Sequence, residues 1–216
     1  MGTQEPPKPG QSALVLLYPG CTIAEVIELA TRLTDGGVDV RYVAAGTAAG
    51  ILAITDRSGL RLTPDSPIDA ADPASVDLVV IPGGDPAAIM NDPKVSRLLG
   101  EVADGGGIIA GICAGVLVIA AAGLLVGRSV THNYRPPWAP PEVSSFVAHF
   151  WEGAIVEPDP SVGVVVDGRL VTALPNATVE FAMTVCRLLG LYTDDRADRV
   201  GRHLRGEYVA ELYDGS

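Results

Sequence analysis

The chain has 216 residues, of which 48% are hydrophobic, and its formal net charge is −11. This length fits one large domain or one domain with appendages, and the apolar content is enough to bury a substantial core. A nucleic-acid-binding protein would present a basic face, and none is visible. No apolar run reaches the ~18 residues of a membrane span. We therefore expect neither a nucleic-acid partner nor a membrane partner.

The N-terminal residues 1–11 are rich in Pro and Gly and are expected to form a disordered leader, since a signal peptide's basic and apolar regions are missing. The cysteines are Cys21, Cys113 and Cys186, an odd number without a CxxC pair. This pattern argues against a disulfide scaffold and favours a reducing, cytoplasmic location. No His/Cys cluster has the spacing of a zinc site, so no metal is predicted.

Short apolar runs alternate with stretches of helical periodicity along the first half of the chain. Ala13–Tyr18 fits a buried parallel strand. Thr22–Thr34 predicts a helix with one apolar stripe, capped by Thr22 and stopped at Gly36-Gly37. Further elements are expected as strands at Val38–Ala44, Leu78–Ile81 and Gly107–Ile112, a hairpin arm at Arg57–Leu62, and helical stretches within Asp85–Asp104 and Ala114–Ala122.

In the second half, Val162–Val166 and Leu170–Ala173 flank Asp167-Gly168, a strong hairpin turn signal. Helical segments follow at Thr178–Leu189, with Asn176 or Ala177 at its start, and at Asp194–Tyr213. The Pro-rich residues 134–141 predict an irregular loop or lid.

This alternation predicts an α/β fold with a doubly wound, mostly parallel sheet and helices on both faces. We expect an α/β domain over residues 12–192, with an insert near 134–160, and a C-terminal helical extension over 193–216. Ligands of such sheets bind beyond the carboxyl ends of the strands.

Cys113 stands between a strand of small and β-branched residues and a helix of small residues, in the sequence AGICAG. This is the pattern of a nucleophile elbow, whose sharp turn leaves one side chain projecting from the sheet edge. A cysteine at a helix N-terminus is expected to have a lowered pKa and a raised thiolate fraction. The alternative is a buried structural cysteine.

The segment GICAG after a strand, preceded by a strand ending in IPGGD, resembles the ThiJ/PfpI superfamily, which has a flavodoxin-like, class I glutamine amidotransferase-like fold. ALVLLYPG and DGRLVTALPNATVEFA are similar to the branch that contains the parkinsonism-associated glyoxalase/deglycase. The resemblance spans roughly residues 12–190.

The resemblance implies that Cys113 is the nucleophile and that Glu25 is the acidic residue bonded to it, with Glu28 as the rival. It also implies that Gly83 and Gly84 form the glycine turn of the site. The backbone N–H groups of Gly84 and Ala114 would then face an oxyanion beside the sulfur.

The histidine of the family site is less well matched. A gapless count places Asn133 at that position and His132 one residue early, and one residue of slip in a strand turns a side chain to the opposite face. His132 therefore serves after a local adjustment, or it does not face the cysteine. His149, in the insert, is a second candidate pocket residue.

Other residues are candidates for the pocket or for packing near it. Cys21 either lines the pocket or is a small buried residue, and Pro175 lies in the Pro-containing loop of the family match. Trp138 and Trp151 form either an aromatic lid over the substrate or the packing of the insert or of a dimer interface. Cys186 is expected to be structural.

The resemblance implies a cofactor-independent enzyme with a small-molecule substrate and a homodimeric state. A glyoxalase-like conversion of 2-oxoaldehydes is the first expectation, and an isonitrile hydratase or a dedicated biosynthetic hydratase or lyase is the alternative. A non-enzymatic redox or stress protein that senses oxidants at Cys113 has the same sequence features. Peptidase activity is not expected, because Ala114 stands where peptidase relatives carry a histidine.

Overall fold

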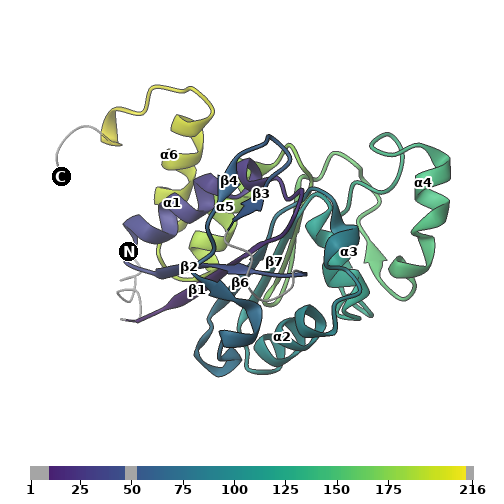
Figure 1. Cartoon of the computed structure of the whole chain (residues 1–216). Coiled ribbons are helices and arrows are strands. Elements are labelled where there is room, and N and C mark those ends of the chain that lie inside the picture. Colours follow the sequence, from purple (N-terminus) through teal and green to yellow (C-terminus); the bar gives the residue numbers. More distant parts are fainter. Residues whose placement is uncertain (1–9, 47–52, 213–216) are drawn as a thin grey trace.

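The computed structural model describes residues 10–46 and 53–212 of the chain (Figure 1). Most of the predicted leader, residues 1–9, and Tyr213 at the end of the last predicted helical segment lie outside the described residues. Within the described part, no helix is long and apolar enough to cross a membrane.

A central sheet of seven strands forms the middle layer of the described structure, in the order β10-β11-β7-β6-β1-β2-β5. Every neighbouring pair is parallel except β10 and β11, which form the predicted hairpin. The strands are β1 (Ser12–Leu17), β2 (Asp39–Ala44), β5 (Ser66–Pro67), β6 (Leu78–Ile81), β7 (Ile108–Ile112), β10 (Val164–Asp167) and β11 (Leu170–Ala173).

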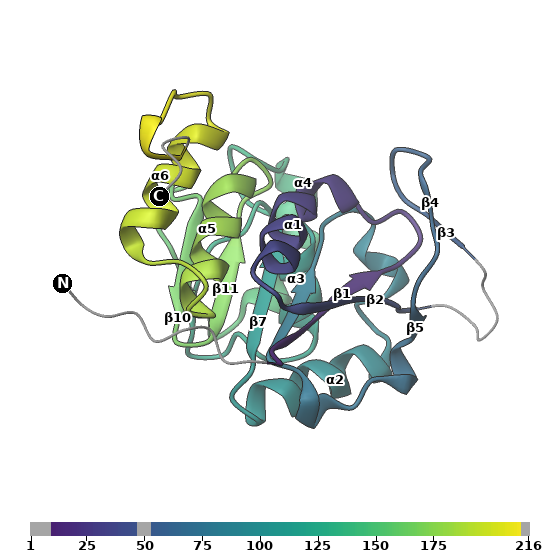
Figure 2. The same ribbon diagram turned by 90° about the vertical axis from the view of Figure 1, so that its left-hand side faces the viewer.

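Helices cover both faces of this sheet (Figures 1 and 2). One face carries α1 (Ile27–Asp35) and α5 (Thr178–Leu188), and the other carries α2 (Pro93–Asp104) and α3 (Gly115–Ala121). A further helix, α6 (Asp194–Leu204), packs on α5 and is tied to it by an ion pair of 3.0 Å between Arg205 and Glu180. The predicted doubly wound α/β fold is confirmed.

Shorter elements connect and decorate this core. They are two small sheets, β3 (Ile54–Thr55) with β4 (Arg61–Leu62) and β8 (Ser129–Val130) with β9 (Ile155–Val156), the helix α4 (Pro141–Phe146), and the 3-10 turns η1 (Ile23–Glu25), η2 (Ile68–Ala70), η3 (Pro73–Ser75), η4 (Pro86–Ala88), η5 (Ala148–Trp151) and η6 (Ala210–Leu212).

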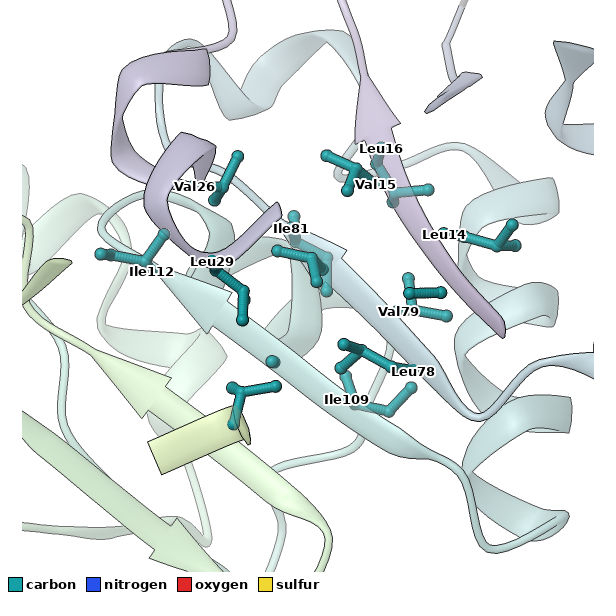
Figure 3. Close-up of a cluster of buried hydrophobic side chains, with 14 of the residues drawn as sticks. Leu14, Val15, Leu16, Val26, Leu29, Leu78, Val79, Ile81, Ile109 and Ile112 are labelled. Atoms are coloured by element: carbon teal, nitrogen blue, oxygen red, sulfur yellow. The ribbon is translucent and has the colours of Figure 1, made fainter. Parts of the chain in front are cut away.

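The core lies along β1, β6 and β7, whose residues are all buried. Strands of a parallel sheet are covered on both faces, which explains why they are continuous apolar runs rather than alternating ones. Figure 3 shows Val26 and Leu29, from the first helical region, beside Ile81 and Ile112 at the ends of β6 and β7. This packing fixes the first helical region over the carboxyl edge of the sheet.

Two helix predictions are wrong in detail. The helix expected from Thr22 is split into the separate turn η1 and the helix α1, because Val26 adopts a non-helical conformation between them. Thr22 makes no side-chain cap. The helix expected over Asp194–Tyr213 ends at Leu204, since Gly206 has a φ of 92° that an α-helix cannot contain.

Candidate active site

The loops after β1, β6 and β7 meet at one edge of the sheet, where the chain changes direction. It runs from β1 outward to β2 and then returns to β6 on the other side of β1. Ligands of doubly wound sheets bind at such a switch point. Glu25 follows β1, Gly83 and Gly84 follow β6, and Cys113 follows β7, so the candidate residues gather there.

Cys113 occupies the predicted elbow. Its φ of 56° is the single positive value among the non-glycine residues that the structure describes, a conformation that costs about 1–3 kcal/mol. Its N–H donates to the Ala173 carbonyl over 2.9 Å, which anchors the turn to β11. A side chain at Gly115 would overlap the Ile81 carbonyl, and one at Gly111 would come within 2.6 Å of Ile119 Cδ1. Both glycines therefore allow α3 to approach the sheet closely.

Glu25 lies in η1 with its carboxyl group against the cysteine. Its Oε2 accepts a hydrogen bond of 2.8 Å from the Gly83 N–H, and the carboxyl group is also hydrogen-bonded to the Cys113 side chain. The rival, Glu28, forms an ion pair of 2.6 Å with Arg32 on α1. The choice of Glu25 over Glu28 as the partner of Cys113 thus agrees with the geometry.

The glycine turn after β6 packs directly on this pair. A Cβ atom at Gly83 would lie 2.7 Å from Cys113 Cβ and 2.9 Å from its Sγ, so no side chain fits there. Gly84 has a φ of 121° and forms a bridge with Cys21. The backbone N–H groups of Gly84 and Ala114 both donate to the sulfur, an arrangement suited to hold an oxyanion formed next to it.

The predicted lowering of the cysteine pKa is wrong for this site. Burial raises the pKa of Cys113 to about 12, and the negative charge of Glu25 adds to the rise, although the N–H groups of Ala114 and Gly84 oppose it. Burial also raises the pKa of Glu25, against the hydrogen bonds from Gly83 and Cys113 and the charge of Arg57. The field of the seven-residue helix α3 is too weak to outweigh burial.

The two groups therefore titrate as a coupled pair that retains one proton over a wide pH range. Once the first proton has left, a thiolate can exist if Glu25 holds the remaining proton and donates it back as a hydrogen bond. The remaining proton rests on Cys113, whose pKa is raised to about 12, and the Glu25 carboxylate is placed to take it, because a second negative charge in the same buried space is strongly disfavoured.

The sequence matches the model of the DJ-1/PfpI family over residues 11–188. The chain belongs to the DJ-1/PfpI family. This confirms the resemblance to ThiJ/PfpI proteins seen in the sequence motifs.

Three relatives of this chain carry different names. The chain is 32% identical over 182 residues to Protein dj-1beta of Drosophila melanogaster, covering 83% of this chain and 89% of that protein. It is 32% identical over 124 residues to "Glutathione-independent glyoxalase DJR-1.2" of Caenorhabditis elegans, covering 56% of this chain and 64% of that protein. It is 29% identical over 163 residues to "Uncharacterized protease YoaZ" of Bacillus subtilis, covering 74% of this chain and 73% of that protein.

The fold agrees with solved structures of the same family. The structure of a thiJ/pfpI family protein from Bacillus anthracis superposes with a TM-score of 0.77, at 26% identity, covering 95% of this chain and 96% of that one. The chain and this solved structure thus share the same fold.

The third side chain at this site, beside Cys113 and Glu25, is that of Asn133. Asn133 Nδ2 lies 3.8 Å from Cys113 Sγ, while the neighbouring His132 is buried and stacked on Trp151, with ring centroids 3.9 Å apart. The Nδ1 atom of His132 accepts a hydrogen bond of 3.1 Å from the Tyr134 N–H. Burial, helped by the charge of Arg135, lowers the pKa of His132 to about 4.

These contacts correct the assignment of His132 as a catalytic residue. Its ring packs inside the protein in the neutral form, and the side chain one residue later faces the sulfur. Asn133, which the gapless count placed at the position of the family's histidine, is therefore the side chain that faces the sulfur.

The insert packs largely on itself. Trp138 Nε1 donates to the Pro160 carbonyl over 3.1 Å, and His149 is exposed and lies against Phe150, with ring centroids 4.0 Å apart. Trp151 contributes the stack on His132. Trp138 thus packs within the insert, whereas Trp151 holds the insert against His132. That His149 folds over the site stays a prediction, since the ring contact it makes is with its neighbour Phe150.

Cys21 is fully buried beside the glycine turn, and burial raises its pKa. Cys186 is fully buried in α5. Both behave as small buried residues. Pro175 lies in the turn between β11 and α5, at the same edge of the sheet as Cys113.

Across the ranges 10–46 and 53–212, no group of three or more His, Cys, Asp or Glu could hold a metal ion.

Two tyrosines lie near the sulfur, and one of them, Tyr18, was not recognised from the sequence as part of the site. The Tyr18 hydroxyl donates to the carbonyls of Pro82 and Gly83, each 2.7 Å away, and so fixes the glycine turn. Burial raises the pKa of Tyr134 to about 12, and the charge of Cys113 adds to it. The polar end of Tyr18, directly after the apolar strand β1, was the available signal, since a buried hydroxyl needs a partner.

Proposed function

We propose that this protein is a cofactor-independent, cysteine-dependent enzyme that acts on a small electrophilic carbonyl compound. The reaction that fits best is a glyoxalase-like conversion of a 2-oxoaldehyde and water to a 2-hydroxy acid. The observation that carries the proposal is the hydrogen-bonded pair of Glu25 and Cys113 with two backbone N–H groups beside the sulfur. The glyoxalase name of one relative supports the same choice.

The first step adds the thiol to the aldehyde. The thiol proton moves to Glu25 as the sulfur forms a bond to the aldehyde carbon, and the carbonyl electrons move to the oxygen. The N–H groups of Gly84 and Ala114 stabilise that oxygen. Glu25 then returns the proton to it, which gives a neutral hemithioacetal and restores the carboxylate.

In the second step, Glu25 removes the hydrogen of the former aldehyde carbon as a proton and returns it to the neighbouring carbon, while the hydroxyl proton of the hemithioacetal passes to the oxygen on that neighbouring carbon. The former aldehyde carbon is thereby oxidised and its neighbour reduced, so no external redox cofactor enters. Water then attacks the resulting thioester, and the sulfur leaves with a proton. The products are a 2-hydroxy acid and the free thiol.

The test is turnover of methylglyoxal by the full chain, followed as lactate formation. We expect Cys113→Ser to abolish turnover and Glu25→Gln, which cannot carry the proton, to lower kcat by at least about 100-fold. Glu28→Gln, one turn away and paired with Arg32, serves as the matched control and should retain most activity. Wild-type protein without turnover on methylglyoxal or phenylglyoxal would contradict the proposal.

A redox role is the second candidate. Cys113 is only partly buried, whereas Cys21 and Cys186 are fully buried, so a peroxide reaches Cys113 first. The N–H groups at its sulfur could also bind sulfinate oxygens. A peroxide-dependent gain of two oxygens at Cys113, in a protein with no turnover of dicarbonyls or isonitriles, would favour this role over the enzyme.

A further inference from the structure

The side chain of Asn133 offers an acceptor at the reacting centre that no protein group uses. Its Nδ2 faces Cys113 Sγ, and its Oδ1 is buried without a hydrogen-bond partner. Both atoms belong to one amide, so Oδ1 is part of the side-chain group that contacts the sulfur. A buried acceptor left unpaired is costly, and in a functional site it indicates a donor that arrives with a ligand.

The groups around the sulfur show which donor that is. The N–H groups of Gly84 and Ala114 and Nδ2 of Asn133 are all donors. Among the side chains that contact the Cys113 sulfur in the described structure, acceptor oxygens belong to Glu25 and to Asn133. Glu25 must stay available for the hydrogen on carbon in the proposed reaction, so only Oδ1 remains for a second donor.

A hemithioacetal carries that second donor. When the sulfur adds to an aldehyde, the carbonyl oxygen becomes a hydroxyl, which accepts from N–H groups through its lone pairs and must donate its hydrogen elsewhere. We infer that Asn133 Oδ1 accepts this hydrogen bond, and that Asn133 makes the site specific for substrates whose sulfur adduct carries a hydroxyl, namely aldehydes. This inference rests on the proposed function for the electrophile but does not require turnover.

The inference also separates substrate classes. An isonitrile gives an adduct with nitrogen, rather than a hydroxyl, on the carbon bound to sulfur, so its initial adduct has no hydroxyl for Oδ1 to bind. An amide does not titrate in the accessible pH range, so this acceptor is available at every pH at which the protein is folded. Asn133 is therefore a specificity-determining residue and not a proton carrier.

The test measures adduct formation with propanal, an aldehyde that lacks the second carbonyl and stops at the hemithioacetal. Propanal protects Cys113 from iodoacetamide, and the protection curve, read by mass spectrometry at that cysteine, gives the dissociation constant. Asn133→Leu removes the acceptor and should weaken propanal binding by about 10- to 100-fold, the usual effect of leaving one buried hydrogen bond unmade.

Asn133→Asp is the discriminating variant. It keeps an oxygen acceptor, and addition of a neutral thiol to a neutral aldehyde changes no charge, so propanal affinity should stay within about threefold of wild type. Both variants lose Nδ2, so both should be alkylated more slowly by iodoacetamide, which consumes the thiolate. Asn91→Leu, at an exposed asparagine, should match wild type in both assays.

Propanal affinity that is unchanged in Asn133→Leu, or weakened equally in Asn133→Leu and Asn133→Asp, would overturn the inference. Circular dichroism checks the fold of each variant, and Asn133→Ala replaces Asn133→Leu if the larger side chain prevents folding. Failure of the proposed function is seen separately, as absence of lactate formation in wild-type protein that still binds propanal.

Discussion

Cys113 and Gly83 illustrate how single residues set the chemistry of this site. The cysteine is held at a φ of 56°, and Gly83 packs so closely that a Cβ atom would meet Glu25 Oε2 and both side-chain atoms of the cysteine. The glutamate end can move aside, but Cys113 Cβ cannot. The hydrogen-bonded pair therefore depends on the absence of one methyl group.

We predict that Gly83→Ala displaces Glu25 from the sulfur and lowers both turnover and the alkylation rate of Cys113 by at least about tenfold. Gly100→Ala is the control, because a Cβ atom there meets nothing within 4 Å in the middle of α2. An alkylation rate equal to wild type in Gly83→Ala would show that the contact is not needed to prepare the thiol.

His132 makes the stability of the protein depend on pH. Its pKa is lowered to about 4 by burial, while in the unfolded chain it is about 6.5. Between these values the unfolded state binds more protons, so the stabilising contribution is complete above pH 6.5 and is lost as the pH falls towards 4.

From pH 7 to pH 5 we expect this histidine to lower the free energy of unfolding by about 2 kcal/mol. His132→Phe keeps an uncharged ring against Trp151 and should remove that part of the decrease in urea unfolding. His149→Gln, at an exposed histidine, should leave it unchanged. A His132→Phe protein with the full wild-type decrease would contradict the assignment.

At the scale of elements, the elbow works because α3 lies unusually close to β6 and β7. Gly115 begins α3, and a side chain there would overlap the Ile81 carbonyl. Backbone cannot yield as a side-chain end can, so the whole helix would have to shift.

Gly115→Ala should therefore destabilise the fold by about 2 kcal/mol or more and move the Ala114 N–H away from the sulfur, lowering kcat more than it raises KM. Chemical unfolding and steady-state kinetics on the same preparation check both effects. The Gly100→Ala control in α2 should be neutral or slightly stabilising.

At the scale of the whole molecule, stability comes from a sheet buried on both faces. Leu16 of β1 is fully buried between the helical layers, whereas Leu60 in the β3–β4 turn is 52% exposed. We expect Leu16→Ala to lower the free energy of unfolding by about 2–5 kcal/mol. Leu60→Ala should change it by less than about 1 kcal/mol, measured by urea denaturation.

The sequence alone determined the layered α/β fold, the elbow cysteine, its acidic partner and the glycine turn. The fold and the elbow are encoded locally, by apolar runs bounded by turns and by small residues at fixed spacing, whereas Glu25 and the glycine turn followed from the resemblance of the motifs to the family. Helix ends were less well determined, because the conformations of Val26 and Gly206 depend on the segments around them.

Only the tertiary structure decided three features of the site. The face on which Asn133 and His132 lie depends on the register of a short segment against its neighbours, and one residue exchanges the two. The pKa of Cys113 depends on how deeply the sulfur and Glu25 are buried together, which outweighs the helix N-terminus that the sequence showed. The place of the aromatic insert, with Trp151 on His132, depends on contacts between segments that no local pattern encodes.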